Sequence, residues 1–126
     1  MFVNDYRDLE VWQRAMEIAE LVYRLTRGYP RDEQYGMTAQ MWRASTSIPA
    51  NLAEGWGRGG RREFLRFIRI AQGSLKELET QLLLSERVQL ATPTQTAPIL
   101  QQTAILGRQL TALRRSLLRS NQTPPE

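Results

Sequence analysis

The sequence predicts an all-α protein folded as a single antiparallel, up-down four-helix bundle. Four long segments repeat apolar residues every three or four positions, which is the pattern of a helix with one buried face. Short connections rich in glycine and proline separate these segments and favour antiparallel neighbours. Because no segment alternates apolar and polar residues with the period of a half-buried strand, we expect no sheet. The 126 residues suffice for one domain with its own core.

The first helix is predicted over about residues 8–27, with Asp8 as its N-cap and a glycine and a proline after its end. Its apolar residues fall on two adjacent stripes. One stripe is Leu9, Trp12, Met16, Ala19 and Tyr23, and the other is Val11, Ala15, Ile18, Val22 and Leu25. The second helix is expected over about 36–55. Pro49 lies inside it and removes one backbone donor, so we predict a proline kink there.

The glycine-rich segment GWGRGG, at residues 55–60, is expected to be a flexible connection. It leads into a third helix over about 61–90, whose apolar positions repeat at the helical period. Its predicted core residues are Phe64, Phe67, Ile68, Ala71, Leu75, Leu78 and Leu82. Residues 92–98 contain two prolines and are predicted to be a linker before a fourth helix over about 97–119.

Composition argues against catalysis. The chain has no cysteine, which excludes disulfides and thiolate metal sites, and no histidine, the commonest general base and metal ligand. Carboxylates do not cluster in their place, so we expect no enzyme activity, metal site or cofactor. The chain lacks both the roughly 18 apolar residues of a membrane span and a signal-peptide pattern. We therefore expect a cytoplasmic protein without a membrane partner, with one domain over residues 1–120 and a disordered tail over 121–126.

A basic cluster opens the third predicted helix. It consists of Arg58, Arg61, Arg62, Arg66 and Arg69, and Lys76 continues it. Three of these arginines are spaced i, i+4 and i+7, so they share one face of a helix. Such a stripe is typical of a surface that binds phosphates, and a helix N-terminus also favours anions. The alternative is a solvated face with salt bridges, in a chain whose arginine content reflects a genome of high GC content.

A second basic stretch lies near the end of the fourth predicted helix. It consists of Arg108, Arg114, Arg115 and Arg119. Cations near a helix C-terminus complement the helix dipole, so helix stabilisation is the simpler explanation of this stretch. We keep it as a secondary candidate for nucleic-acid binding.

Surplus apolar residues predict self-association. A lone four-helix bundle needs one seam and a flank on each helix, whereas three of the predicted helices carry more. The additional residues are Leu21, Leu65, Ile70, Leu83, Leu84, Leu100, Ile105 and Leu118. A monomer would expose them in patches larger than soluble monomers usually tolerate, so we expect a homo-oligomer.

Three segments also resemble a known family. They are DLEVWQRAMEIAELVYRLTRGYP, SIPANLAEGWGR and EFLRFIRIAQGSLKELETQL. The resemblance is to the bacterial four-helix bundle proteins encoded within intervening sequences of 23S rRNA genes, and it covers about residues 6–118. It is weakest at 89–99, where this chain is rich in proline and threonine. The resemblance implies a ring-like homopentamer without established enzymatic activity.

A related group of proteins serves as accessory subunits of diversity-generating retroelements, where they bind RNA or DNA and a reverse transcriptase. Two hypotheses follow from the residues and this resemblance. In the first, the protein is a non-catalytic oligomer that binds nucleic acid, with RNA favoured over DNA. In the second, it is a scaffold that docks a protein partner, such as a reverse transcriptase.

Overall fold

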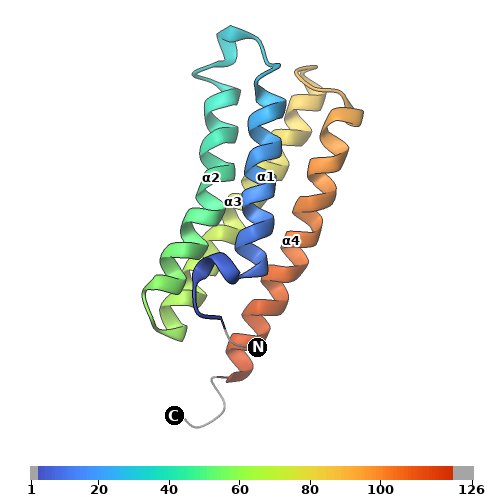
Figure 1. The fold of residues 1–126 in the computed structure, drawn as a ribbon. Helices are drawn as coiled ribbons and strands as arrows, with labels where there is room; N and C mark the ends of the chain where they lie inside the picture. The colour runs from blue at the N-terminus through green and yellow to red at the C-terminus, as the bar shows by residue number, and fades with distance from the viewer. Residues whose placement is uncertain (1–2, 121–126) are drawn as a thin grey trace.

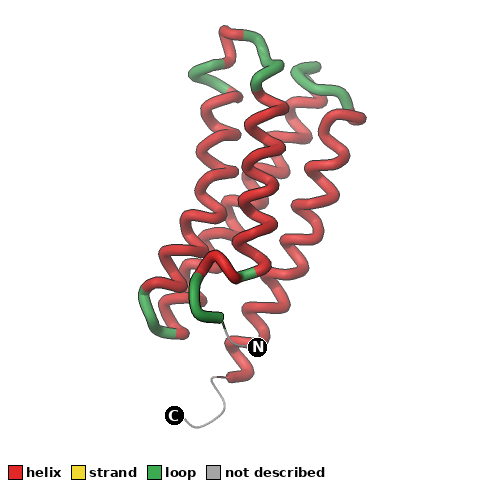
Figure 2. The backbone as a smooth tube through the Cα atoms, in the orientation of Figure 1, coloured by secondary structure: helices red, strands yellow, loops and turns green. Residues whose placement is uncertain are grey.

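The computed structural model describes residues 3–120 and contains four α-helices. These are α1 (Glu10–Thr26), α2 (Met37–Gly57), α3 (Arg61–Arg87) and α4 (Pro93–Ser120). Short 3-10 turns, Tyr6–Asp8 and Arg31–Glu33, precede α1 and α2. No strand occurs between residues 3 and 120 (Figure 2), which confirms the all-α prediction. The predicted tail at 121–126 lies outside the described residues.

The helices form a bundle in which the chain reverses direction at each connection (Figure 1). Each helix packs against two neighbours, in the order α1, α2, α3, α4 and back to α1, so α1 lies diagonally across from α3. This arrangement is the up-down bundle that short connections favour. The C-terminal ends of α1 and α3 therefore lie at one end of the bundle, and the N-terminus of α3 lies with the C-terminus of α4 at the other.

The core consists of most of the apolar positions that the sequence indicates, with exceptions on α1. Each helix contributes side chains that are fully shielded from water, among them Ile18, Met41, Ile48, Leu78 and Leu106. Burying one such side chain stabilises the folded state by about 1.5–3 kcal/mol. The predicted core positions of α3, from Phe64 to Leu82, are all buried.

The start of α1 differs from the prediction. Asp8 is not its N-cap, because Asp8 belongs to the preceding 3-10 turn, and Leu9 occupies the cap position without a side-chain hydrogen bond. The carboxylate that does cap is that of Asp5, which accepts a hydrogen bond from the backbone amide of Arg7. Leu9 is instead buried in the core, so hydrophobic packing fixes where this helix begins.

The end of α2 also differs. Gly55 and Gly57 belong to the helix, so the flexible connection shrinks to residues 58–60. Gly55 is required for close packing, because a Cβ atom there would lie 2.5 Å from the Cβ atom of Phe67 on α3. This glycine therefore lets α2 and α3 approach at the end of the bundle where the basic cluster begins. Pro49 lies inside α2, and the kink at that position stays a prediction.

The predicted linker at 92–98 is wrong, because α4 already begins at Pro93. Thr92 and Gln95 form a capping box. The backbone N–H of Gln95 donates to Thr92 Oγ1 at 3.2 Å, and the backbone N–H of Thr92 donates to the side-chain Oε1 of Gln95 at 2.9 Å. Proline suits the first helical position because its missing N–H would have no partner there. The third helix ends at Arg87 rather than near residue 90, and Gln89 adopts a φ of 67° in the turn between the two helices.

Candidate nucleic-acid interface

The bundle brings the two basic stretches to the same end of the molecule. Helices α3 and α4 are antiparallel neighbours (Figure 1), and Gly107 on α4 faces Leu75 on α3 across their interface. Counting outward from this contact, residues 62–69 of α3 lie level with residues 113–120 of α4. Two stretches that are about 40 residues apart in the sequence therefore approach each other, with Lys76 and Arg108 level near the middle of α3 and the other cations toward one end of the bundle.

The arginine stripe of α3 lies on the side of the helix that faces away from the core. Arg62, Arg66 and Arg69 border a shallow hollow of about 510 Å³ whose other lining residues are Leu65 and Ile70. Arg66 forms an ion pair with Glu63 at 3.6 Å. Neither Arg62 nor Arg69 lies within 4 Å of a carboxylate of residues 3–120. This stripe therefore presents two uncompensated guanidinium groups to solvent.

Arg58 is positioned for a structural role. Its guanidinium contacts Glu54 at 2.8 Å and Glu63 at 4.0 Å, and the hydrogen bond to Glu54 raises the pKa of Arg58 above its usual value. The same guanidinium lies 5.2 Å from the ring centre of Phe67, and that of Arg66 lies 4.8 Å from it. Arg58 thus ties the end of α2 to the start of α3.

A groove between α3 and α4 brings Lys76, the last residue of the first basic stretch, together with two arginines of the second stretch. It has a volume of about 700 Å³, and Lys76 from α3 and Arg108 and Arg115 from α4 line it together with polar side chains that include Gln72 and Thr111. One carboxylate, that of Glu79, also lines the groove, and it pairs with Lys76 at 3.2 Å. The arginines of α4 have no such partner among the described residues.

Arg114 and Arg119 lie outside this groove. Arg114 is half-buried near the C-terminal end of α4, and Arg119 lies exposed in its last turn, where a cation complements the helix dipole. The second basic stretch is therefore divided. Arg108 and Arg115 face the groove, whereas Arg119 occupies a position that helix stabilisation also explains.

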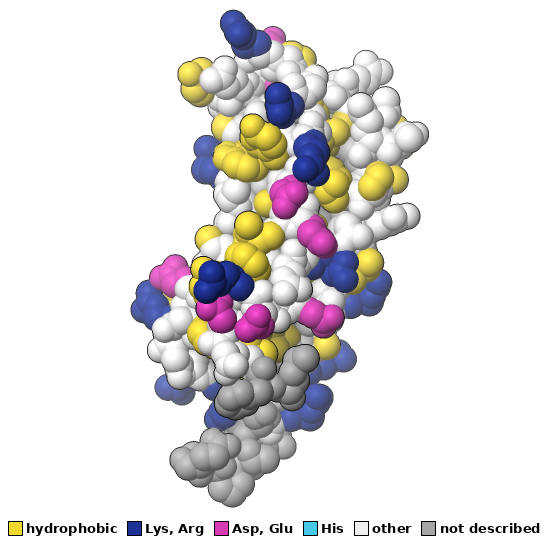
Figure 3. All heavy atoms as spheres, in the orientation of Figure 1, with side chains coloured by type: hydrophobic (Ala, Val, Ile, Leu, Met, Phe, Trp, Pro, Cys, Tyr) yellow, Lys and Arg dark blue, Asp and Glu magenta, His cyan; other side chains and the backbone are white. Residues whose placement is uncertain are grey.

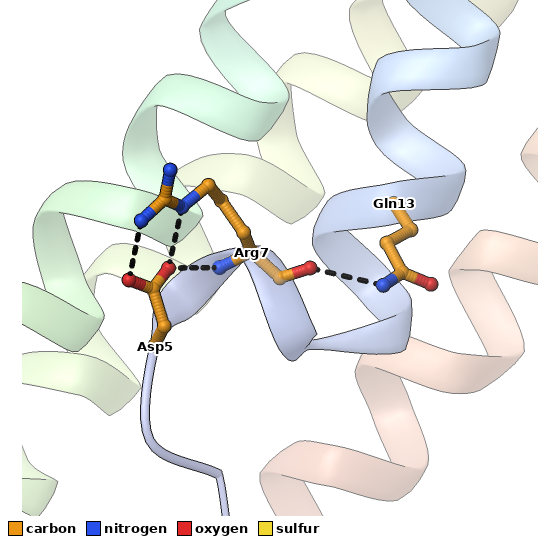
Figure 4. Close-up of polar contacts among 3 residues, drawn as sticks. All are labelled: Asp5, Arg7 and Gln13. Carbon is orange, nitrogen blue, oxygen red and sulfur yellow. Dashed lines mark hydrogen bonds and ion pairs between the residues drawn. The ribbon is translucent and has the colours of Figure 1, made fainter.

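Other arginines serve the fold. Figure 4 shows Arg7 in a bidentate pair with Asp5, in which the Arg7 hydrogen bonds lower the pKa of Asp5 to about 2. The Arg7 carbonyl accepts a hydrogen bond from the Gln13 side chain at 2.9 Å, which fastens the 3-10 turn to α1. The half-buried Arg14 donates to the amide oxygen of Gln109 at 3.0 Å and so ties α1 to α4.

An apolar groove between α1 and α2 is the feature that sequence reasoning missed. It has a volume of about 720 Å³, and Figure 3 shows its hydrophobic side chains gathered on the face that α1 and α2 present. Met16, Tyr23 and Trp42 line it and are 38%, 48% and 42% exposed. The sequence assigns Met16 and Tyr23 to a core stripe of the first helix, and this assignment is wrong for these two side chains, which lie exposed in the groove. Leu9 and Ala19 of the same stripe are buried. Trp12 is half-buried and packs against the core.

Between residues 3 and 120, no group of three or more histidine, cysteine, aspartate or glutamate side chains is arranged to hold a metal ion. None of the helices in this part of the chain is long and apolar enough to cross a bilayer.

Comparison with known families places this fold. Residues 7–112 match the family model described as 23S rRNA-intervening sequence protein. The chain belongs to this family. A solved structure from Bacteroides thetaiotaomicron, described as a protein with unknown function from the S23 ribosomal protein family, has the same fold with a TM-score of 0.74. The two chains are 24% identical over 82% of this chain and 97% of that one. No curated protein matches the chain.

Proposed function

We propose that this member of the family is a non-catalytic, ring-like homo-oligomer that binds nucleic acid, RNA in the first place, through the basic surface of α3 and α4. The observation that supports this proposal most strongly is the meeting of the two basic stretches at one end of the bundle. The family description, which refers to intervening sequences of 23S rRNA, agrees with an RNA ligand.

The charge of this surface is poorly compensated. Arg62 and Arg69 on α3 have no carboxylate of residues 3–120 within 4 Å, and the same holds for the four arginines of the second stretch. Several fixed cations on one surface attract the phosphates of a nucleic acid, and the counterions released on binding drive the association. The cations at the start of α3 also oppose the helix dipole, so helix stability does not explain them.

Exposed apolar side chains on two separate faces support self-association. One set lines the groove between α1 and α2. The other includes Leu83, Leu84 and Val88, which are 49%, 44% and 55% exposed near the end of α3. The second set is carried by α3, which lies diagonally across the bundle from α1, and Leu84 also lines a hollow beside Met37 of α2. A contact that joins one surface to the other on the next subunit repeats around an axis, and it forms a ring when the rotation between subunits closes. The expected number of five subunits in the ring rests on the family resemblance.

The apolar groove is also the observation that favours the second candidate, a scaffold that docks a protein such as a reverse transcriptase. In that case the partner would occupy the groove and the arginines would be dispensable. Partner binding that survives Arg62→Glu together with Arg66→Glu would support the scaffold over the nucleic-acid-binding oligomer.

Binding of fluorescently labelled RNA at about 50 mM salt tests the proposed function. Nonspecific complexes have dissociation constants of about 10⁻⁴ to 10⁻⁶ M at physiological salt, and lower salt strengthens them. We therefore expect a dissociation constant in the low micromolar range or below, measured by fluorescence anisotropy. An RNA that stays free at about 100 μM protein under these conditions rules out the proposed function.

A further inference from the structure

We propose that the ligand of the α3 and α4 surface is the phosphodiester backbone of a duplex, in preference to an unpaired strand. This inference rests on the proposed function and specifies the form of nucleic acid that the surface fits. It follows from two features of the interface, which are the absence of accessible aromatic rings and the regular spacing of the cations.

Proteins that bind single strands combine a basic groove with aromatic side chains on which the bases stack. No phenylalanine, tyrosine or tryptophan lines the hollow beside Arg66 or the groove beside Lys76. The aromatic rings near this end of the bundle are used in packing. Phe64 and Phe67 are 8% and 5% exposed, and Trp56 is half-buried against the core.

The exposed aromatic side chains lie elsewhere. Among residues 3–120 these are Tyr23, Tyr35 and Trp42, which are carried by α1, by the turn before α2 and by α2. Tyr23 and Trp42 pack against each other in the apolar groove, with ring centres 5.3 Å apart. A strand bound along α3 and α4 therefore has no ring on which to stack its bases. Recognition at this surface depends on phosphates, which both strands of a duplex present on the outside.

The cations form a fixed pattern. Arg62, Arg69 and Lys76 follow one another at intervals of seven residues along α3, and seven residues of α-helix span about 10.5 Å. Arg108 and Arg115 repeat the same interval on α4, and packed helices lie about 8–10 Å apart. These two rows face the regular phosphates of a duplex without prior ordering of the ligand. A flexible single strand loses conformational freedom to match them, with no stacking to offset that loss.

Four probes of one sequence test this inference. They are duplex RNA and duplex DNA of about 20 base pairs, longer than the roughly 16 that a double-stranded RNA-binding domain spans, and an unstructured single strand of each chemistry. At about 50 mM salt we expect the better duplex to bind at least about tenfold more tightly than either single strand. The difference in affinity between the two duplexes shows whether the surface prefers the phosphodiester backbone of RNA or that of DNA.

A groove variant supplies the second readout. Arg108→Gln with Arg115→Gln is expected to weaken duplex binding about tenfold, whereas Arg31→Gln with Arg87→Gln at the opposite end leaves it unchanged. All four side chains are exposed, so circular dichroism should show the wild-type helix content in both variants. Equal or tighter binding of a single strand overturns the duplex inference and leaves the proposed function standing. If none of the four probes binds, the proposed function itself is wrong.

Discussion

Replacing Arg62, Arg66 and Arg69 together with glutamate is expected to lower the affinity for RNA by about 100-fold at about 50 mM salt. Each substitution changes the formal charge by two units, so the three take the chain from +4 to −2. Loss of each exposed charge pair with a phosphate removes up to about 1 kcal/mol, and three such losses correspond to roughly two orders of magnitude in affinity. Titration of labelled RNA with wild-type and variant protein measures the effect.

The variant should retain its fold, because the three side chains are exposed on α3. Arg62 also lies in the first turn of this helix, where a glutamate complements the helix dipole. A matched control replaces Arg31, Arg43 and Arg87 with glutamate, which gives the same net charge at exposed positions away from the basic surface. Equal losses of affinity in both variants would show that net charge, and not this surface, governs binding.

Introducing Glu at Met16 and Trp42 is expected to convert the oligomer into folded monomers of 14.6 kDa. Both side chains are partly exposed in the isolated chain, so the bundle itself should tolerate the charges. In an assembly that fills the groove between α1 and α2, the two carboxylates would be removed from water in a mostly apolar contact, and the loss of hydration costs several kcal/mol for each ion. Multi-angle light scattering at micromolar concentration measures the mass, and circular dichroism checks the helix content.

The control for this experiment is Gln34→Glu with Tyr35→Glu, which adds the same charge at exposed positions outside the groove. This control should keep the wild-type mass. An oligomer that survives the Met16 and Trp42 substitutions would show that its subunits meet at another surface. A wild-type protein near 14.6 kDa would refute self-association. A wild-type dimer or tetramer would keep self-association and refute the number five, and a dimer would also contradict the proposed ring.

The four helices could be predicted because their apolar residues recur at the helical period. The boundaries were harder to predict, since several of them depend on packing. Leu9 is placed by its burial in the core, and Gly55 is helical because α2 must approach Phe67 closely. The start of α4 could have been predicted from the sequence, because Thr92 and Gln95 have the spacing of a capping box. The two nearby prolines led instead to the prediction of a linker.

The candidate site could be predicted only in part. Helical spacing is enough to place Arg62, Arg66 and Arg69 on one face. The groove that joins Lys76 to Arg108 depends on how α3 and α4 are aligned, and that alignment is set by long-range packing of residues such as Leu75 and Gly107. Periodicity within a single helix carries no information about such an alignment, and for the same reason it could not reveal the apolar groove between α1 and α2.

The salt dependence of RNA binding by the wild-type protein tests the central claim most directly. If the basic surface neutralises about five phosphates, a plot of log K against log salt concentration should fall with a slope of about −4 to −5. Such a slope would show that contacts between the protein's cations and phosphates supply most of the affinity. A slope near zero, or no binding at about 50 mM salt, would contradict the assignment of α3 and α4 as a nucleic-acid interface.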